Sequence, residues 1–209
     1  LSDISHQTKT PISNILLFAE LLEEMELPKD GQVAVKALKD QAGKLRFLIQ
    51  ALVKISRLEQ GVVEVIPGRN PLQGVMERVF TQIRPKAEEK GVALALEASE
   101  LWAVFDPKWT EEALYNLADN GVKYTPPGGK VTISARAFEM FVRIDVSDTG
   151  MGIAEEEQSR IFSRFYRSAD AADQEGVGVG LFLAREIISR EGGYIRVESV
   201  KGKGSLFSI

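Results

Sequence analysis

The hydrophobic pattern of this 209-residue chain changes its period near residue 60. Before that point apolar residues recur with helical spacing, whereas from about residue 71 strand-like and helical stretches alternate. The stretch GVVEVIPGRNP between the two parts has two Gly and two Pro around a short β-branched run, which is typical of a linker. We therefore predict a helical domain over residues 1–60, a linker over 61–70 and a second domain over 71–209.

Two helices joined by a short turn account for the first domain. The first runs to about Glu26 and the second spans about Asp30 to Gln60, with Pro28 and Gly31 in the turn. Apolar residues of the second helix recur at spacings of four and three, at Leu38, Ala42, Leu45, Ile49 and Leu52. A lone hairpin has too little core to be stable, so we expect two copies to pair into a four-helix bundle, as a homodimer.

The second domain alternates helices and strands. Helical spacing predicts helices at about 72–90, 110–123 and 179–191, the second with Thr110 as its N-cap. Strand signals fall at about 92–97, 103–105, 131–138, 141–148, 193–198 and 204–209. A short turn joins strands 131–138 and 141–148, which should pair antiparallel. These elements predict an α+β two-layer sandwich, with helices over one face of a mixed sheet.

Composition narrows the possible functions. Lys and Arg total 26 against 30 Asp and Glu, a formal charge of −4 without a long basic run, so nucleic acid is not an expected partner. The absence of Cys and the single His exclude thiol catalysis and multi-His metal sites, which leaves oxygen-preferring ions as possible metals. No stretch approaches the roughly 18 apolar residues of a membrane span, so we expect a soluble piece. It starts within an amphipathic pattern and stops within a strand-like one, which suggests part of a longer protein.

Polar residues gather on one stripe of the predicted helix 110–123. Asn116, Asn120 and Lys123 line up opposite the core face of that helix. Two amides and an ammonium on one stripe form either a solvated surface or a surface that binds a ligand. The spacing alone leaves both interpretations open.

Two glycine clusters follow. Asp148 ends a predicted strand and runs into Gly150 and Gly152, which places a carboxylate beside bare backbone, where a flat base can donate an amino hydrogen. The second cluster comes at the start of the last predicted helix, at Gly176, Gly178 and Gly180. Exposed amides at a helix N-terminus suit phosphate, although a flexible hinge has the same composition.

The only histidine, His6, lies opposite the apolar stripe of the first helix. Pro11 has no amide hydrogen and crowds the carbonyl of Gln7, so the helix should bend and expose the imidazole. A lone exposed histidine is either an ordinary surface residue or a nucleophile.

Taken in order, these motifs resemble those of the sensor histidine kinases. Asn116 to Tyr124, DTGMG at 148–152, IFSRFYR at 161–167 and GVGVGL at 176–181 resemble the N, G1, F and G2 boxes, and SHQTKTP at 5–11 resembles the H box. The resemblance covers nearly the whole chain. It implies a dimeric helical hairpin of the HisKA type followed by an ATP-binding domain of the GHKL type.

The resemblance implies roles for residues of the second domain. Asn120 would supply an amide oxygen to Mg²⁺, with Asn116 nearby, and Lys123 would meet phosphate. Asp148 would accept a hydrogen bond from the adenine amino group. The implied nucleotide-binding residues are Asn116, Asn120, Lys123, Tyr124, Asp148, Gly150, Gly152, Gly176, Gly178, Gly180 and Leu181. Residues 154–178 would form a mobile lid, anchored by Phe162 and Phe165.

The resemblance also implies phosphotransfer by the first domain. His6 would attack the γ-phosphorus of ATP and pass the phosphoryl group to an aspartate of a response-regulator receiver domain. Thr10 matches the position that orients water when family members dephosphorylate their partner, or it is a polar filler. Leu17 and Leu21 continue an apolar surface below His6, either as a dimer seam or as a docking patch for the receiver. The chain would be the cytoplasmic portion of a membrane-bound bacterial sensor, with a missing N-terminal segment as its only link to the membrane.

Gln7 departs from the family pattern. The residue after the phosphorylated histidine is usually Glu or Asp, which takes up proton charge, whereas an amide can orient the ring but cannot act as a base. Two alternatives therefore stay open. One is a core that works mainly as a response-regulator phosphatase, and the other is a non-catalytic nucleotide-binding interaction module.

Replacing Gln7 by Glu should speed autophosphorylation of His6, because a carboxylate can take up the proton that the amide cannot. The rate at which label from γ-labelled ATP enters the chain measures the change. Labelling at the unchanged or a slower rate would contradict the role given to residue 7.

Overall fold

A computed structural model describes residues 2–60, 64–171, 174 and 176–209, and the side chains of residues 2–9, 58, 59 and 171 lie outside this description. The chain divides into two compact units, Leu1–Val63 and Glu64–Ile209. Each unit is described by itself. In the described residues, no helix is both long enough and apolar enough to cross a bilayer.

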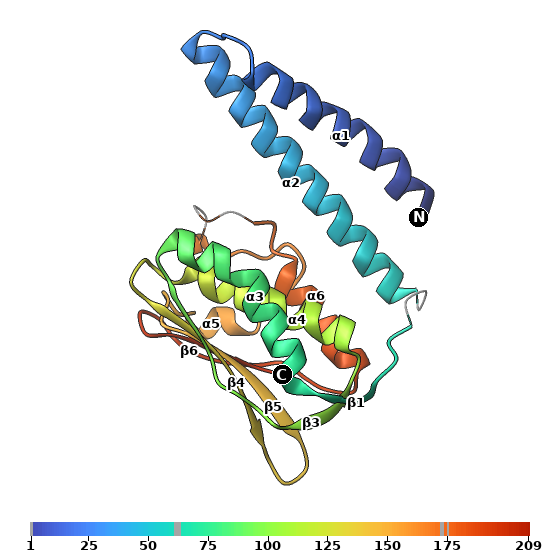
Figure 1. Ribbon diagram of the computed structural model, residues 1–209, viewed down its shortest axis with the longest axis vertical. Coiled ribbons are helices and arrows are strands. Elements are labelled where there is room, and N and C mark those ends of the chain that lie inside the picture. The colour runs from blue at the N-terminus through green and yellow to red at the C-terminus, as the bar shows by residue number, and fades with distance from the viewer. Residues whose placement is uncertain (1, 61–63, 172–173, 175) are drawn as a thin grey trace. The chain divides into compact units, whose positions relative to one another are not determined.

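The first unit is a helical hairpin. α1 spans Ser2–Glu23 and contains Pro11, and α2 spans Lys29–Glu59 (Figure 1). α1 ends slightly before the predicted Glu26. One cluster of buried residues in the hairpin consists of Ile12, Leu16 and Ala42, with Ile49 packed against it, and further buried apolar residues are Ala19, Val35, Ala51 and Ile55. The other residues of the predicted apolar repeat, Leu38, Leu45 and Leu52, are exposed in the single chain.

A five-stranded sheet forms the base of the second unit. Its order is β2 (Ala93–Leu96), β4 (Lys130–Ala137), β5 (Val142–Asp148), β7 (Gly204–Ser208) and β6 (Arg196–Val200). β2 runs parallel to β4 and the remaining neighbours are antiparallel, so the sheet is mixed. In this register Asp148 pairs with Val131 on one side and with Ser205 on the other.

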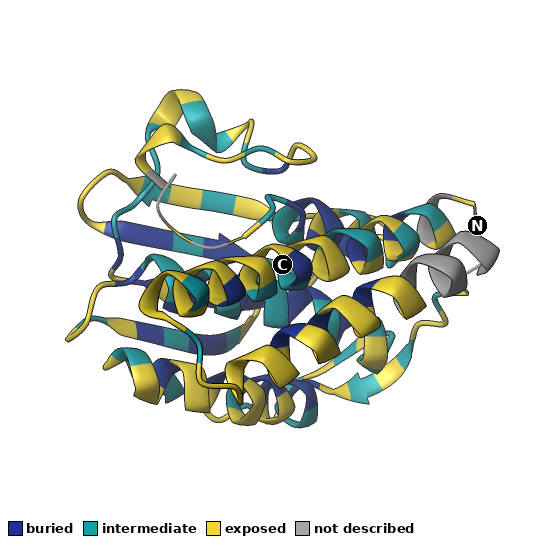
Figure 2. Ribbon diagram, turned by 90° about the horizontal axis from the view of Figure 1, so that it is seen from above, coloured by how far each residue is buried: buried dark blue, intermediate teal, exposed yellow. Residues whose placement is uncertain are grey.

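Three helices cover one face of that sheet. They are α3 (Leu72–Lys90), α4 (Pro107–Tyr124) and α6 (Gly180–Arg190) (Figure 1). Their inner faces and the middle strands form the core, whereas β2 and β6 at the sheet edges are more exposed (Figure 2). This arrangement confirms the predicted two-layer α+β sandwich.

Some short elements were not predicted. β1 (Gly68–Pro71) pairs antiparallel with β3 (Trp102–Phe105) in a separate two-stranded sheet, so residues 68–70, predicted as linker, are a strand. The strand begins with a glycine and ends with a proline, and because both residues are uncommon in strands, the sequence pattern does not predict it. Glu155–Gln158 forms a one-turn helix, α5, and Ala169–Ala171 forms a 3-10 turn.

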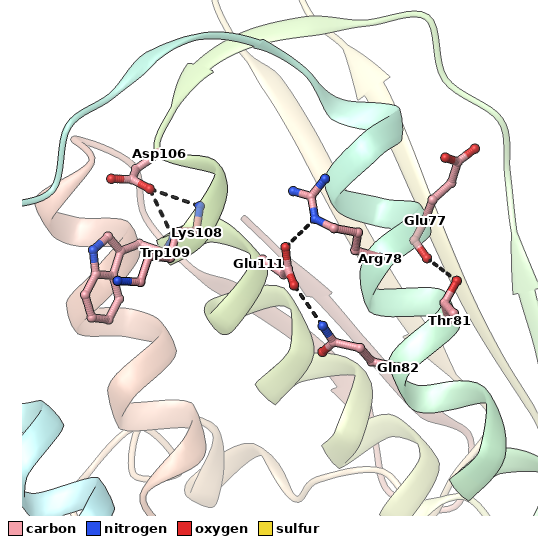
Figure 3. A network of polar contacts seen from close by, with 8 residues as sticks. All are labelled: Glu77, Arg78, Thr81, Gln82, Asp106, Lys108, Trp109 and Glu111. Carbon is pink, nitrogen blue, oxygen red and sulfur yellow. Dashed lines mark hydrogen bonds and ion pairs between the residues drawn. The ribbon is translucent and has the colours of Figure 1, made fainter.

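Helix α4 begins earlier than predicted. Its N-cap is Asp106 instead of Thr110, because Oδ1 of Asp106 accepts hydrogen bonds from the amides of Lys108 and Trp109 (Figure 3). Pro107 at the first helical position favours the same start. Thr110 is buried inside the helix and donates its hydroxyl to Glu191.

Polar contacts attach α4 to α3. The carboxylate of Glu111 accepts a hydrogen bond from Nε of Arg78 at 2.5 Å and another from Nε2 of Gln82 at 2.8 Å (Figure 3). Lower on the helices, Lys86 of α3 pairs with Asp119 of α4. These bonds fix the helix that carries the asparagine stripe.

Candidate functional site

Asn116 meets the second glycine cluster. Its Nδ2 donates to the carbonyl of Glu112 at 2.7 Å, a bond within α4 that fixes the orientation of the amide. A Cβ added to Gly180, the first residue of α6, would lie only 2.7 Å from Oδ1 of Asn116. The side chain from α4 and the backbone of α6 therefore meet, with no room for a larger residue.

Lys123 meets the same glycine-rich stretch. A Cβ added to Gly176 would lie 2.6 Å from Nζ of Lys123, and Gly176 has a φ of 136°, which disfavours other residues. The ammonium also lies 4.7 Å from the centre of the Tyr124 ring. Asn120 is half-buried on the stripe between Asn116 and Lys123, and Leu181 is half-buried at the start of α6. The amide oxygen of Asn116 and the ammonium of Lys123 thus face glycine backbone from a later part of the chain.

Asp148 stands at the end of β5 and is almost fully buried, at 8% exposure. Its Oδ1 accepts hydrogen bonds from the amides of Gly150 at 2.8 Å and Ser205 at 3.2 Å. Burial raises the pKa of the Asp148 carboxyl, and the hydrogen bonds from Gly150 and Ser205 oppose that rise. Because both backbone donors bind Oδ1, the plane of the carboxyl is fixed and Oδ2 can accept from a ligand.

Glycines let the loop after β5 approach its neighbours. A Cβ on Gly150 would lie 2.6 Å from the carbonyl oxygen of Tyr124 at the end of α4. A Cβ on Gly152, which has a φ of 66°, would lie 2.1 Å from the carbonyl oxygen of Val200. The loop that follows Asp148 is therefore wedged between α4 and the turn after β6.

A backbone hydrogen bond joins the described part of the predicted lid to the second glycine cluster. The amide of Phe165 donates to the carbonyl of Gly178 at 2.8 Å, and Phe165 has a left-handed φ of 60°. The ring of Phe162 is buried and meets the ring of Phe207 edge-on at 6.5 Å. The ring of Phe165 is 49% exposed, so in this arrangement Phe162 anchors the lid by its side chain and Phe165 does not.

The residues predicted for phosphotransfer lie in the first unit. His6 and Gln7 belong to α1, but their side chains lie outside the described residues. Thr10 is exposed on the same helix, one turn after His6. In the second unit, by contrast, the structure brings Asn116 to Gly180, Lys123 to Gly176 and Asp148 to Gly150.

Two contributors to the site were missed by sequence reasoning. Ser205 supplies the second amide to Asp148, and Lys90 at the end of α3 donates its Nζ to the carbonyls of Val122 and Lys123. Burial lowers the pKa of Lys90, as do the charges of Lys86 and Lys123. A lysine in the last turn of a helix is common, so nothing in the local sequence distinguishes Lys90 as the cap of a second helix.

Two family models match the chain. Residues 1–61 match the His Kinase A (phospho-acceptor) domain. Residues 105–209 match the histidine kinase-, DNA gyrase B- and HSP90-like ATPase domain. The two matches fall on the two units and agree with the motifs read from the sequence.

Relatives and solved structures give the same family. Sensor protein SrrB of Staphylococcus aureus is 28% identical over 215 residues, which cover 100% of this chain but only 37% of SrrB. Full-length ShkA, solved in complex with AMPPNP, has a TM-score of 0.79 at 28% identity, covering 99% of this chain and 44% of ShkA. ThkA in complex with the response regulator TrrA has a TM-score of 0.70 at 21% identity, covering 99% of this chain and 59% of that one, and shows the fold.

Replacing Asp148 by Asn should remove the preference for a base with an exocyclic amino group, such as adenine, without unfolding the domain. The amide oxygen can still accept from Gly150 and Ser205, but the amide NH₂ would face another donor, so affinity for ATP should fall about tenfold to 100-fold. Calorimetric titration with Mg·ATP measures the loss.

The stability of the same variant relative to wild type should depend on pH in a defined direction. Burial raises the pKa of Asp148 in the folded state, so the protonated carboxyl stabilises the fold below the unfolded-state pKa. This stabilisation is lost as the pH rises through the folded-state pKa, where the carboxyl ionises. The stability of Asp148→Asn relative to wild type should therefore be higher at pH 7 than at pH 4, as measured by denaturant unfolding. A constant difference between the two pH values would contradict this assignment.

Replacing Gly180 by Ala should weaken ATP binding, because the new Cβ displaces the amide of Asn116. We expect a loss of about tenfold with little loss of stability, since Ala is a better helix former than Gly. Gly74→Ala in α3 is the matched control, since its Cβ would meet only the flexible end of Arg78, at 3.5 Å. Equal ATP affinity for the two variants would show that the contact with Asn116 is unimportant.

Proposed function

The chain belongs to the sensor histidine kinases, and from this premise we propose that its second unit holds Mg·ATP while His6 takes the γ-phosphoryl group and passes it to an aspartate of a response-regulator receiver domain. The chain spans 37% of the length of SrrB, so the proposal concerns the phosphotransfer core. We propose further that this core is the cytoplasmic portion of a membrane-anchored bacterial sensor.

The observation that carries the proposal is the meeting of α4 with the two glycine clusters. Oδ1 of Asn116 faces Gly180 and Nζ of Lys123 faces Gly176, although these glycines lie more than 50 residues further along the chain. Amide oxygens, an ammonium and exposed backbone amides at the start of α6 are the groups that bind a metal-bound phosphate chain. A purely structural contact would not need this collection of polar groups.

The groups on α4 also suit a magnesium ion. Mg²⁺ keeps water and phosphate oxygens and needs only one or two oxygens from the protein, which Asn120 and its neighbour Asn116 can supply. When bound, the ion neutralises charge that develops on the phosphate oxygens during transfer. Lys123 adds a fixed positive charge on the same stripe.

Asp148 accounts for base selection. A buried carboxylate held by two backbone amides can only accept hydrogen bonds, so it favours the exocyclic amine of adenine over the carbonyl that guanine has at the same position. Gly150 lets its backbone amide come against that carboxylate, because a Cβ there would lie 2.8 Å from Oδ1 of Asp148 and 2.6 Å from the carbonyl oxygen of Tyr124. These two features support ATP as the nucleotide.

In the transfer step, a ring nitrogen of His6 attacks the γ-phosphorus, the bond to the bridging oxygen breaks, and ADP leaves. The proton on the other ring nitrogen must be released, and Gln7 cannot take it. We propose that solvent takes this proton. The loss of an acid at residue 7 supports a slow kinase. The phosphatase alternative rests on Thr10, which is exposed and matches the family position that orients water.

The surfaces of the hairpin support two protein partners. Leu38, Leu45 and Leu52 of α2 are exposed apolar residues at bundle spacing, which supports pairing with a second copy. Leu17 and Leu21 of α1 are also exposed, and serve either that seam or the docking of a receiver domain. ThkA, which shares the fold, was solved with its response regulator bound.

Incubation of the chain with γ-labelled ATP and Mg²⁺ tests the proposal. We expect an acid-labile, base-stable label in wild type and none in His6→Ala, because a phosphorylated imidazole has that stability profile, whereas phosphorylated serine, threonine and tyrosine are stable in acid. Thr10→Ala is the matched control, which should keep the label but lose phosphatase activity toward a phosphorylated receiver domain. Equal labelling of His6→Ala would contradict the role of His6, and binding of ATP without any label would favour the interaction module.

A further inference from the structure

A carboxylate joins α6 to α4 at the end of the helix pair that lies away from the glycine cluster. Glu191 is the C-cap of α6, and its Oε1 accepts from the backbone amide of Asp106 at 3.0 Å. The hydroxyl of Thr110, 3% exposed, lies 3.0 Å from Oε1 and 2.8 Å from Oε2 of the same carboxylate. Three polar contacts therefore join the end of α6 to the first turn of α4.

The partners of Glu191 are themselves fixed. Oδ1 of Asp106 caps α4 through the amides of Lys108 and Trp109, as Figure 3 shows, and its Oδ2 accepts from the amide of Ile66 at 3.0 Å. Asp106 thus has backbone bonds on both sides of its carboxyl. Glu191 therefore attaches α6 to a part of α4 that backbone hydrogen bonds already hold in position.

The apolar surface between the helices does not by itself fix their position along each other. α4 carries buried Leu114, Leu117 and Ala118, α6 carries buried Leu183 and Ile187, and the two helices are in contact. Burial of such side chains is favourable but non-directional, so small shifts along the helix axis change its energy little. Directional hydrogen bonds at one end can set that position.

We propose that Glu191 is a positioning residue of the nucleotide site, which sets the axial position of α6 on α4 and through it the approach of Gly180 to Asn116. α6 is about 16 Å long at 1.5 Å per residue, and a helix transmits an axial shift from one end to the other with little loss. This inference rests on the proposed ATP site.

The geometry at the other end makes the site sensitive to such a shift. The Cβ position of Gly180 lies 2.7 Å from Oδ1 of Asn116, so backbone and amide are already at close range. A displacement of α6 by a fraction of a helical rise would either press on this amide or open a gap beside it. Either change moves an amide that is proposed to lie near the phosphates.

Glu191 is a partly buried acid, and its charge has an energetic disadvantage. Burial, and to a smaller degree the charge of Asp106, raises the pKa of the Glu191 carboxyl, against the hydrogen bonds from Thr110 and the Asp106 amide. At neutral pH the ionised group therefore opposes folding relative to a neutral acceptor. A glutamine in its place would accept the same hydrogen bond from Asp106 without that charge.

Four variants of the chain test the proposal. Glu191→Ala removes the acceptor, Thr110→Val removes one donor at nearly constant shape, and Glu191→Gln retains an acceptor. Arg190→Ala is the control, because Arg190 is exposed on the last turn of the same helix. Calorimetry with AMPPNP and Mg²⁺ gives the Kd, denaturant unfolding gives the stability, and the NMR signal of the Asn116 side-chain amide is recorded without nucleotide.

We expect Glu191→Ala to raise Kd about tenfold and Thr110→Val to raise it less, with Glu191→Gln and Arg190→Ala within about twofold of wild type. The Asn116 amide signal should move in Glu191→Ala before any nucleotide is added. Loss of stability in folded Glu191→Ala, with an unchanged amide signal and unchanged Kd, would overturn the proposal. Should Glu191→Ala not fold, the same two readouts on Thr110→Val decide.

Failure of the proposed function is distinguishable from failure of this inference. If wild type binds no AMPPNP, the ATP site itself is wrong. The Asn116 signal reports on the position of α6 without any ligand, so it still confirms or overturns the mechanical link.

Discussion

The close approach of glycine backbone to α4 is the contact on which the nucleotide site depends. Gly176 and Gly180 come so near Lys123 and Asn116 that a Cβ at either position would collide at 2.6 or 2.7 Å. α4 has little freedom to retreat, because Glu111 attaches it to α3. Polar side chains are therefore held still while bare amide groups are brought to them, which is the preorganisation that binding of a phosphate chain requires.

The division into two units sets what each contributes. The hairpin buries a cluster around Ile12, Leu16 and Ala42 and leaves apolar residues of α2 exposed, which suits the proposed pairing with a second copy. The second unit has a continuous core between three helices and a sheet, and can hold its site without help. In the proposed reaction the phosphoryl group reaches both a nucleotide and a receiver domain, and a histidine carried on a separate unit suits that requirement.

Sequence reasoning succeeded where the signal is local. The bounds of α3 and the place of Asp148 at a strand end follow from periodicity and from the glycines after it. Thr110 was a wrong N-cap because Asp106 followed by Pro107 is the stronger start signal. The contacts of Ser205 with Asp148 and of Glu191 with Asp106 join residues 57 and 85 positions apart, and no local pattern reports such pairs.

The central claim is that one ATP molecule is bound jointly by α4, the loop after Asp148 and the start of α6. Titration of the ¹⁵N-labelled chain with Mg·ATP, followed by NMR, measures this directly. The backbone amides of Gly150, Gly176 and Gly180 and the side-chain amides of Asn116 and Asn120 should shift together along a single saturation curve. Shifts confined to other residues, or different curves for α4 and the glycine clusters, would contradict the claim.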